Sequence, residues 1–245
     1  MFNPRNNSPF GRSRSGASAY QYETLPYTMV GTQTGGLVGK VMALMACSFL
    51  VATVAAFIGV AVFHGLTLGG YLFIVIAGFV ALIALRLMIN VQGINLFLLF
   101  LFVFLEGLGL APLITNYLAA GLGNILGQAF IMTAATSLGL SVYAWTTKRS
   151  FARLGDYLFF GLILLLVAAI VQIFFHSTLF VLLVAFFGVA IFCGYILYYV
   201  QRAKYMADTL PNAIGLTVSL FITVMNLFIY ILEILTILQG GRDRR

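Results

Sequence analysis

The sequence predicts an all-α integral membrane protein built from six or seven transmembrane helices. Hydrophobic residues make up 62% of the 245 residues and charged residues only 8%, whereas a soluble domain has roughly 25% charged residues. A bilayer core about 30 Å thick needs about 20 apolar residues per helix, so the apolar region 41–238 has room for six or seven passes. None of its runs alternates with the period of two expected for barrel strands, which favours helices.

Polar segments flank the predicted membrane domain. Residues 1–36 are rich in Gly, Ser, Asn and Arg, and they are too polar to bury the apolar surface that would offset the entropy of ordering them. We therefore expect a disordered, basic cytoplasmic tail over 1–36, a transmembrane domain over 37–239 and a short basic tail over 240–245. No cleavable signal peptide is expected, because no short apolar core is followed by a small-residue cleavage site.

Polar turns divide the apolar region into successive spans. The first six predicted helices cover about 40–63, 70–88, 96–114, 125–145, 157–175 and 179–200. The last apolar run, about 213–238, could cross the membrane fully or re-enter it as a hairpin. Because this run has no central Gly or Pro to make a hairpin turn, a full seventh span is favoured.

Basic residues occur on only one side of the first six predicted helices. They are Arg5, Arg12, Arg14, Lys40, Arg86, Lys148, Arg149, Arg153, Arg202 and Lys204. The connections after spans one, three and five contain no Lys or Arg, so the positive-inside rule predicts a cytoplasmic N-terminus. A full seventh span puts Arg242, Arg244 and Arg245 on the opposite side, against this rule.

Several classes of function have no support in the sequence. The net charge of +7 does not indicate nucleic-acid binding, because the basic residues are scattered rather than gathered on one groove-sized surface. No catalytic triad, phosphate-binding Gly loop or His-Glu-x-x-His helix occurs, so we expect no catalytic residues, no cofactor and no enzyme. His64 and His176 lie in separate turns, and Cys47 and Cys193 lie within apolar runs; no metal site is expected from them.

Glu106, near the middle of the third predicted span, is the candidate ion or proton site. Ionisable groups are costly inside a membrane, and burial without a partner favours the protonated carboxyl. Glu106 could bind a proton or cation in the bundle, or it could hydrogen-bond a neighbouring helix. Arg86 could anchor its helix at the interface or reach an acidic partner, and Asp208 could cap the last helix or line a cytoplasmic vestibule.

Motifs in the third, sixth and seventh spans form a pattern that covers about 35–238. They are residues 107–112, a basic loop at 147–149 followed by 151–154, residues 191–198 followed by Gln201, and 219–221 followed by 226–230. This pattern resembles the Bax inhibitor-1 family, in particular its bacterial YccA-like branch. The resemblance implies a seven-helix fold in which six helices surround a central seventh.

The same resemblance identifies two positions of a possible gate, Tyr199 and Thr223. Relatives that leak Ca²⁺ in a pH-sensitive manner carry Asp at both matching positions. Two facing carboxylates can share a proton, so such a pair responds to pH. Neither Tyr nor Thr ionises near neutral pH, and the carboxylate gate is therefore degenerate in this chain.

Two alternative functions follow from the resemblance. The first is a stress-related regulator that binds other membrane proteins, such as a membrane-bound quality-control protease complex. The second is a Ca²⁺ or H⁺ leak conduit with Glu106 as its acidic site, and with Tyr199, Thr223 and Asn226 lining the former gate. The bacterial branch implies an inner membrane, where the lipid bilayer is itself a partner.

The charge pattern makes a direct prediction about topology. A tag fused to residue 1 should be digested by protease only from the cytoplasmic side, because the basic connections flank the odd-numbered spans at their cytoplasmic ends. A tag after residue 245 should show the opposite accessibility if the last run crosses fully. An N-terminal tag on the non-cytoplasmic face would invert the assignment of every connection.

Overall fold

The computed structural model describes residues 27–62, 68–174 and 177–240, and these residues form seven helices without a strand among them. The helices are α1 (Tyr27–Val62), α2 (Leu68–Leu87), α3 (Ile94–Ala119), α4 (Gly123–Thr146), α5 (Leu154–Phe174), α6 (Thr178–Ala203) and α7 (Leu210–Gly240). All seven are long and apolar enough to cross a membrane. The predicted all-α transmembrane fold with a seventh span is therefore confirmed.

The first and last helices differ most from the predicted runs. Helix α1 begins at Tyr27, so residues 27–36 are helical although the predicted tail includes them. The rest of that tail and residues 241–245 lie outside the described residues, as do His64 and His176. Helix α7 is one unbroken helix to Gly240, which agrees with a full span rather than a hairpin.

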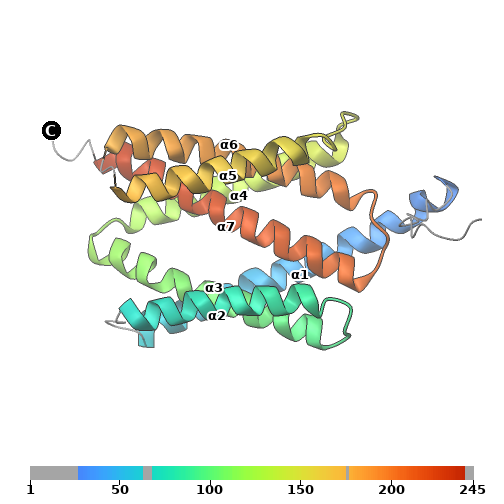
Figure 1. The fold of residues 1–245 in the computed structure, drawn as a ribbon, viewed down its shortest axis with the longest axis horizontal. Helices are drawn as coiled ribbons and strands as arrows, with labels where there is room; N and C mark the ends of the chain where they lie inside the picture. Colours follow the sequence, from blue (N-terminus) through green and yellow to red (C-terminus); the bar gives the residue numbers. More distant parts are fainter. Residues whose placement is uncertain (1–26, 63–67, 175–176, 241–245) are drawn as a thin grey trace, which may run out of the picture.

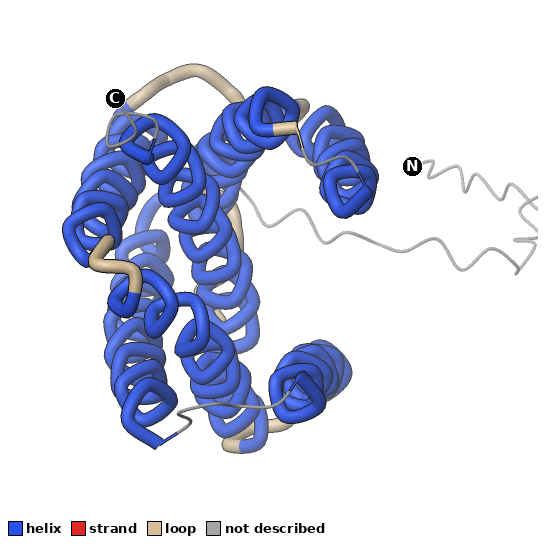
Figure 2. Tube along the Cα trace, turned by 90° about the vertical axis from the view of Figure 1, so that its left-hand side faces the viewer, coloured by secondary structure: helices blue, strands red, loops and turns tan. Residues whose placement is uncertain are grey.

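Helix α7 lies between two groups of three helices. Helix α3 packs on α1 and α2 in one group, and α6 packs on α4 and α5 in the other. Figure 1 shows α7 running obliquely between these groups, where it contacts α1, α3, α4 and α6. The peripheral helices α2 and α5 reach the centre mainly through α3 and α6. Figure 2 shows the same bundle along the helix axes.

Aromatic side chains join α7 to its neighbours. Phe221 is completely buried, with its ring centroid 5.3 Å from that of Phe49 on α1 and 6.3 Å from that of Phe102 on α3. Farther along α7, Phe228 stacks on Phe130 of α4 at 4.3 Å. Association of helices in lipid depends on close packing because lipid tails are as apolar as the side chains, and aromatic pairs add about 0.5–1.5 kcal/mol each.

Small residues allow α1 and α3 to approach closely. Gly107 of α3 lies directly against the main chain of Ala52 and the side chain of Ala55 on α1. One turn later, Ala111 of α3 packs on Gly59 of α1. A side chain at Gly107 would meet backbone atoms, which cannot rotate away.

One end of the bundle carries the basic connections. The chain segments that join α2 to α3, α4 to α5 and α6 to α7 lie together at the right of Figure 1, where α1 also starts. We call this the basic end. Its basic residues lie in these segments or in the last turns of α2 and α6, and they are Arg86, Lys148, Arg149, Arg153, Arg202 and Lys204. Helix α7 finishes at the opposite end.

The packing of Gly107 predicts a stability effect with a matched control. Gly107→Ala should lower the free energy of unfolding by about 1–3 kcal/mol because the added methyl group overpacks the α1–α3 contact. For a chain of this size, the apparent Tm in detergent should fall by roughly 2–12 °C. Gly109→Ala is the control, since no atom of a neighbouring helix lies within 4 Å of an added Cβ there. Equal Tm values for the two variants would contradict the close approach.

Candidate functional site

Glu106 lies between α3 and α2, apart from the gate positions on α6 and α7. Its side chain is half-buried and faces Gly78 of α2, where an added Cβ would lie 3.8 Å from the Glu106 carboxylate oxygen. It makes no hydrogen bond or ion pair with another residue in the described part of the chain. The structure therefore does not bring Glu106 together with Tyr199 and Thr223.

The two gate positions contain no carboxylate, and their side chains make local contacts. Tyr199 of α6 stacks on Tyr195 with ring centroids 5.6 Å apart, and on α7 the Ser219 hydroxyl donates to the Gly215 carbonyl at 2.9 Å. Thr223, one turn after Ser219, is 3% exposed and donates its hydroxyl proton to the Ser219 carbonyl at 2.7 Å. The amide of Asn226 also donates to its own helix, at 2.8 Å. The polar side chains of α7 in this region thus donate to carbonyls of their own helix.

Arg86 and Asp208 both lie at the basic end. The exposed Arg86 side chain is within electrostatic reach of Tyr199, and it forms no ion pair with the acidic residues that the structure describes. Asp208 pairs with Lys40 of α1 at 3.0 Å. The Thr209 hydroxyl, rather than Asp208, accepts a hydrogen bond from a main-chain N–H of the first turn of α7 (3.3 Å). Asp208 therefore links α1 to the α6–α7 connection instead of capping α7.

A polar clamp that sequence reasoning missed holds the α4–α5 connection against α6. Gln201 is buried; its Nε2 donates to the carbonyl of Arg149 at 2.5 Å, and its Oε1 accepts from the N–H of Phe151. The sequence pattern contained Gln201 only as part of a family motif. The signal that could have revealed its role is a neutral amide at the membrane end of an apolar helix, where a connection needs hydrogen-bond partners.

Lys204 caps the C-terminus of α4 from the end of α6. Its ammonium group donates to the carbonyls of Ala144 (2.8 Å) and Trp145 (2.5 Å). The same ammonium lies 5.3 Å from the centroid of the Trp145 ring. A cation at a helix C-terminus is favourable because the last carbonyls lack partners within the helix. Gln201 and Lys204 together attach the α4–α5 region to α6 at the basic end.

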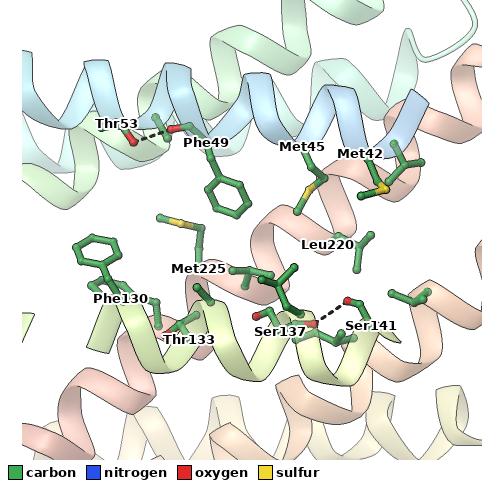
Figure 3. Close-up of a pocket in the computed structure, with 18 of the residues that line it drawn as sticks. Met42, Met45, Phe49, Thr53, Phe130, Thr133, Ser137, Ser141, Leu220 and Met225 are labelled. Atoms are coloured by element: carbon green, nitrogen blue, oxygen red, sulfur yellow. Dashed lines mark hydrogen bonds between the residues drawn. The ribbon is translucent and has the colours of Figure 1, made fainter. Parts of the chain in front are cut away.

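An apolar groove with a volume of about 930 Å³ lies between α1 and α4. We call it the α1–α4 groove. Helices α3, α6 and α7 supply the rest of its wall. Figure 3 shows the side chains of both helices and of α7 facing the groove; the labelled apolar ones are Met42, Met45, Phe49, Phe130, Leu220 and Met225.

The hydroxyl groups that line the α1–α4 groove are directed at their own helices. Thr53, Thr133, Ser141 and Thr146 each donate to a carbonyl one turn earlier, at 2.7–2.9 Å. The Ser137 hydroxyl is buried without a hydrogen-bond partner among the described residues. The groove therefore presents hydrocarbon, with few polar groups for a hydrated ion to bind.

The fold and these sites define a multi-pass helical membrane protein. The sequence profile described as "Inhibitor of apoptosis-promoting Bax1" matches residues 35–240. The chain belongs to the Bax inhibitor-1 family.

Three relatives, one bacterial, one mammalian and one viral, illustrate how widely similar proteins are distributed. A Helicobacter pylori protein is 37% identical over 199 residues, which are 80% of this chain and 84% of the relative. Mouse "Protein lifeguard 4" is 36% identical over 152 residues, 62% of each chain. The "Golgi anti-apoptotic protein" of Vaccinia virus is 30% identical over 154 residues, 63% of each chain. None of these names states an enzymatic activity.

The polar clamp predicts a local change in hydrogen exchange. Gln201→Ala should expose the amide of Phe151 to exchange, because the N–H loses its acceptor. Removal of one partner of a buried hydrogen bond costs about 1–3 kcal/mol, so the protection factor should fall roughly five- to 150-fold, as measured by hydrogen–deuterium exchange mass spectrometry. The neighbouring exposed Arg202 gives the control Arg202→Ala, which should leave exchange over 149–153 unchanged. Unchanged exchange in Gln201→Ala would contradict the clamp.

Proposed function

We propose that the chain is a stress-related regulatory membrane protein that acts by binding other membrane proteins. The main support is the chemistry of the gate positions. Tyr199 and Thr223 supply no carboxylate, and the Thr223 hydroxyl is engaged by the α7 backbone. Ca²⁺ prefers six to eight oxygen ligands including carboxylates, so this region has little to offer a Ca²⁺ ion.

The relatives support regulation as the role. The viral relative is named as an anti-apoptotic protein, and this name supports a regulatory role. We propose a membrane-bound quality-control protease complex as the class of partner. We also propose an inner-membrane location, on the basis of the bacterial relatives, and a cytoplasmic N-terminus, on the basis of the basic end of the bundle.

The peripheral helices α2 and α5 provide surfaces for such a partner within the membrane. Each packs mainly on one helix of the bundle, so most of its circumference is open to neighbours. Phe73 and Phe79 of α2 are 73% and 63% exposed, and Phe160 of α5 is 69% exposed. Large aromatic side chains supply contact area at protein interfaces.

A cation conduit is the second candidate function. The observation that favours it is Glu106, a half-buried carboxyl without a hydrogen-bond partner in the described part of the chain. An ionisable residue inside a membrane is a functional candidate by default. In this alternative, Glu106 carries the ion between α2 and α3, away from the former gate.

Reconstitution separates the two candidates. For the regulator, purified protein in liposomes should pass neither Ca²⁺ nor H⁺ above the background of protein-free vesicles between pH 5 and pH 8. For the conduit, flux should be present and Glu106→Gln should abolish it. Glu233→Gln is the control, because Glu233 accepts a hydrogen bond from Gln172 (3.2 Å) and has no role in the conduit.

Photo-crosslinking in cells completes the same experiment. A photoreactive residue at Phe79 or Phe160 should crosslink to subunits of a membrane protease complex, identified by mass spectrometry. The buried Phe102, which is 1% exposed, is the control position and should give no intermolecular product. Ion flux together with an absence of crosslinks from both outer faces would reject the regulator in favour of the conduit.

A further inference from the structure

The α1–α4 groove is long enough to span the hydrocarbon core of a bilayer, and it is open between the two helices. On α4 its lining residues run from Leu126 to Thr146, a length of about 30 Å at 1.5 Å per residue. This length matches the hydrocarbon core of a bilayer. No contact of appreciable extent joins α1 to α4 among the described residues, so hydrocarbon from the bilayer has lateral access to the groove.

The walls of the groove fit a flexible apolar chain. Met42, Met45 and Met225 point into it together with Phe49 and Phe130 (Figure 3). Methionine side chains adapt to irregular shapes because they are unbranched and polarizable. The groove volume lies in the upper part of the range of ligand pockets, about 300–1,000 Å³, and its hydroxyl groups are mostly occupied by helix carbonyls.

The groove opens toward an excess of positive charge at the basic end. Trp145 and Thr146 line it there, and Lys148 follows Thr146 by two residues, so their Cα atoms are at most about 7 Å apart. Lys148 and Arg149 are exposed and take part in no ion pair that the structure describes. Gln201 holds the main chain of Arg149 against α6, which anchors the connection that carries both basic residues.

Few acidic residues oppose this charge. In the described part of the chain, the basic end carries seven basic residues and two acidic ones, which are Lys40, Arg86, Lys148, Arg149, Arg153, Arg202 and Lys204 against Asp156 and Asp208. Asp208 is already paired with Lys40. A basic site between transmembrane helices on one membrane face is suited to an anionic lipid head group.

We infer that the α1–α4 groove binds an acyl chain of an anionic phospholipid, whose phosphate group is held at the basic end by Lys148 and Arg149. The groove supplies the contacts for the hydrocarbon, and the two side chains supply selectivity for the head group. This binding site goes beyond the proposed regulatory function and does not depend on it.

The single tryptophan of the chain makes the site directly measurable. Trp145 lines the groove at the basic end, so a bromine-labelled acyl chain in the groove should quench its fluorescence. The unmodified protein is reconstituted in dioleoyl phosphatidylcholine vesicles that contain increasing amounts of brominated phosphatidylglycerol or brominated phosphatidylcholine. Because each basic residue near an anionic head group contributes about fivefold in affinity, phosphatidylglycerol should quench half-maximally at a mole fraction roughly 25-fold lower.

Two pairs of variants test the two parts of the site. Lys148→Gln with Arg149→Gln should remove the preference for phosphatidylglycerol. The control pair, Arg86→Gln with Arg153→Gln, should retain it, since Arg86 lies on α2, which contributes no residue to the groove, and Arg153 lies seven residues beyond Thr146, where the α4 lining ends. Thr53→Phe with Ala134→Phe should fill the groove and lower quenching by either lipid several-fold. Their neighbours Val54 and Ala135 are exposed but do not line the groove, so Val54→Phe with Ala135→Phe is the matched control.

Three outcomes would overturn the inference. The first is equal quenching by the two lipids in the unmodified protein, which needs no variant and stands even if a groove-filling variant fails to fold. The second is a groove-filling variant that keeps its helical circular dichroism and its full selective quenching. The third is native mass spectrometry of the purified protein that shows no retained phosphatidylglycerol and a second polypeptide in its place.

Discussion

The close packing of α7 between the α1–α3 and α4–α6 groups is the interaction on which the rest of the structure depends. In water, burial of apolar surface would hold such helices together, but hydrocarbon removes that driving force. Shape complementarity must replace it. Phe221 and Phe228 provide this complementarity by inserting their rings against both groups. The order of the other six helices around α7 follows from these contacts.

The polar groups of the chain are placed by the same constraint. Unsatisfied polar groups are expensive in an apolar environment, so the side chains of Thr223 and Asn226 donate to carbonyls of α7 itself. Stronger donors and acceptors lie at the basic end, where Gln201 and Lys204 serve the connection after α4 and the end of that helix. A buried carboxylate pair is missing at the gate positions, and local hydrogen bonds take its place. The α1–α4 groove remains because α7 separates the two helices that form its sides.

The membership of the chain in the Bax inhibitor-1 family was accessible from short motifs on α3, α6 and α7. Much less of the candidate site could be predicted from the sequence. Helix α3 is apolar around its whole circumference, so no hydrophobic stripe indicates which face it turns to the bundle. The sequence pattern therefore gave no indication that Glu106 faces Gly78. The Lys40–Asp208 pair joins residues 168 positions apart, a separation that no local pattern specifies.

The number, order and type of the helices were determined by the amino-acid sequence, because the thickness of a bilayer converts the length of each apolar run into one crossing. The alternation of basic connections likewise predicted which segments share an end of the bundle. Only the tertiary structure decided which faces meet: Gly107 against Ala52, Gln201 under the α4–α5 connection, and α1 apart from α4. The physical reason is that every face of these helices is compatible with lipid, so rotation and pairing are selected by steric fit between distant segments.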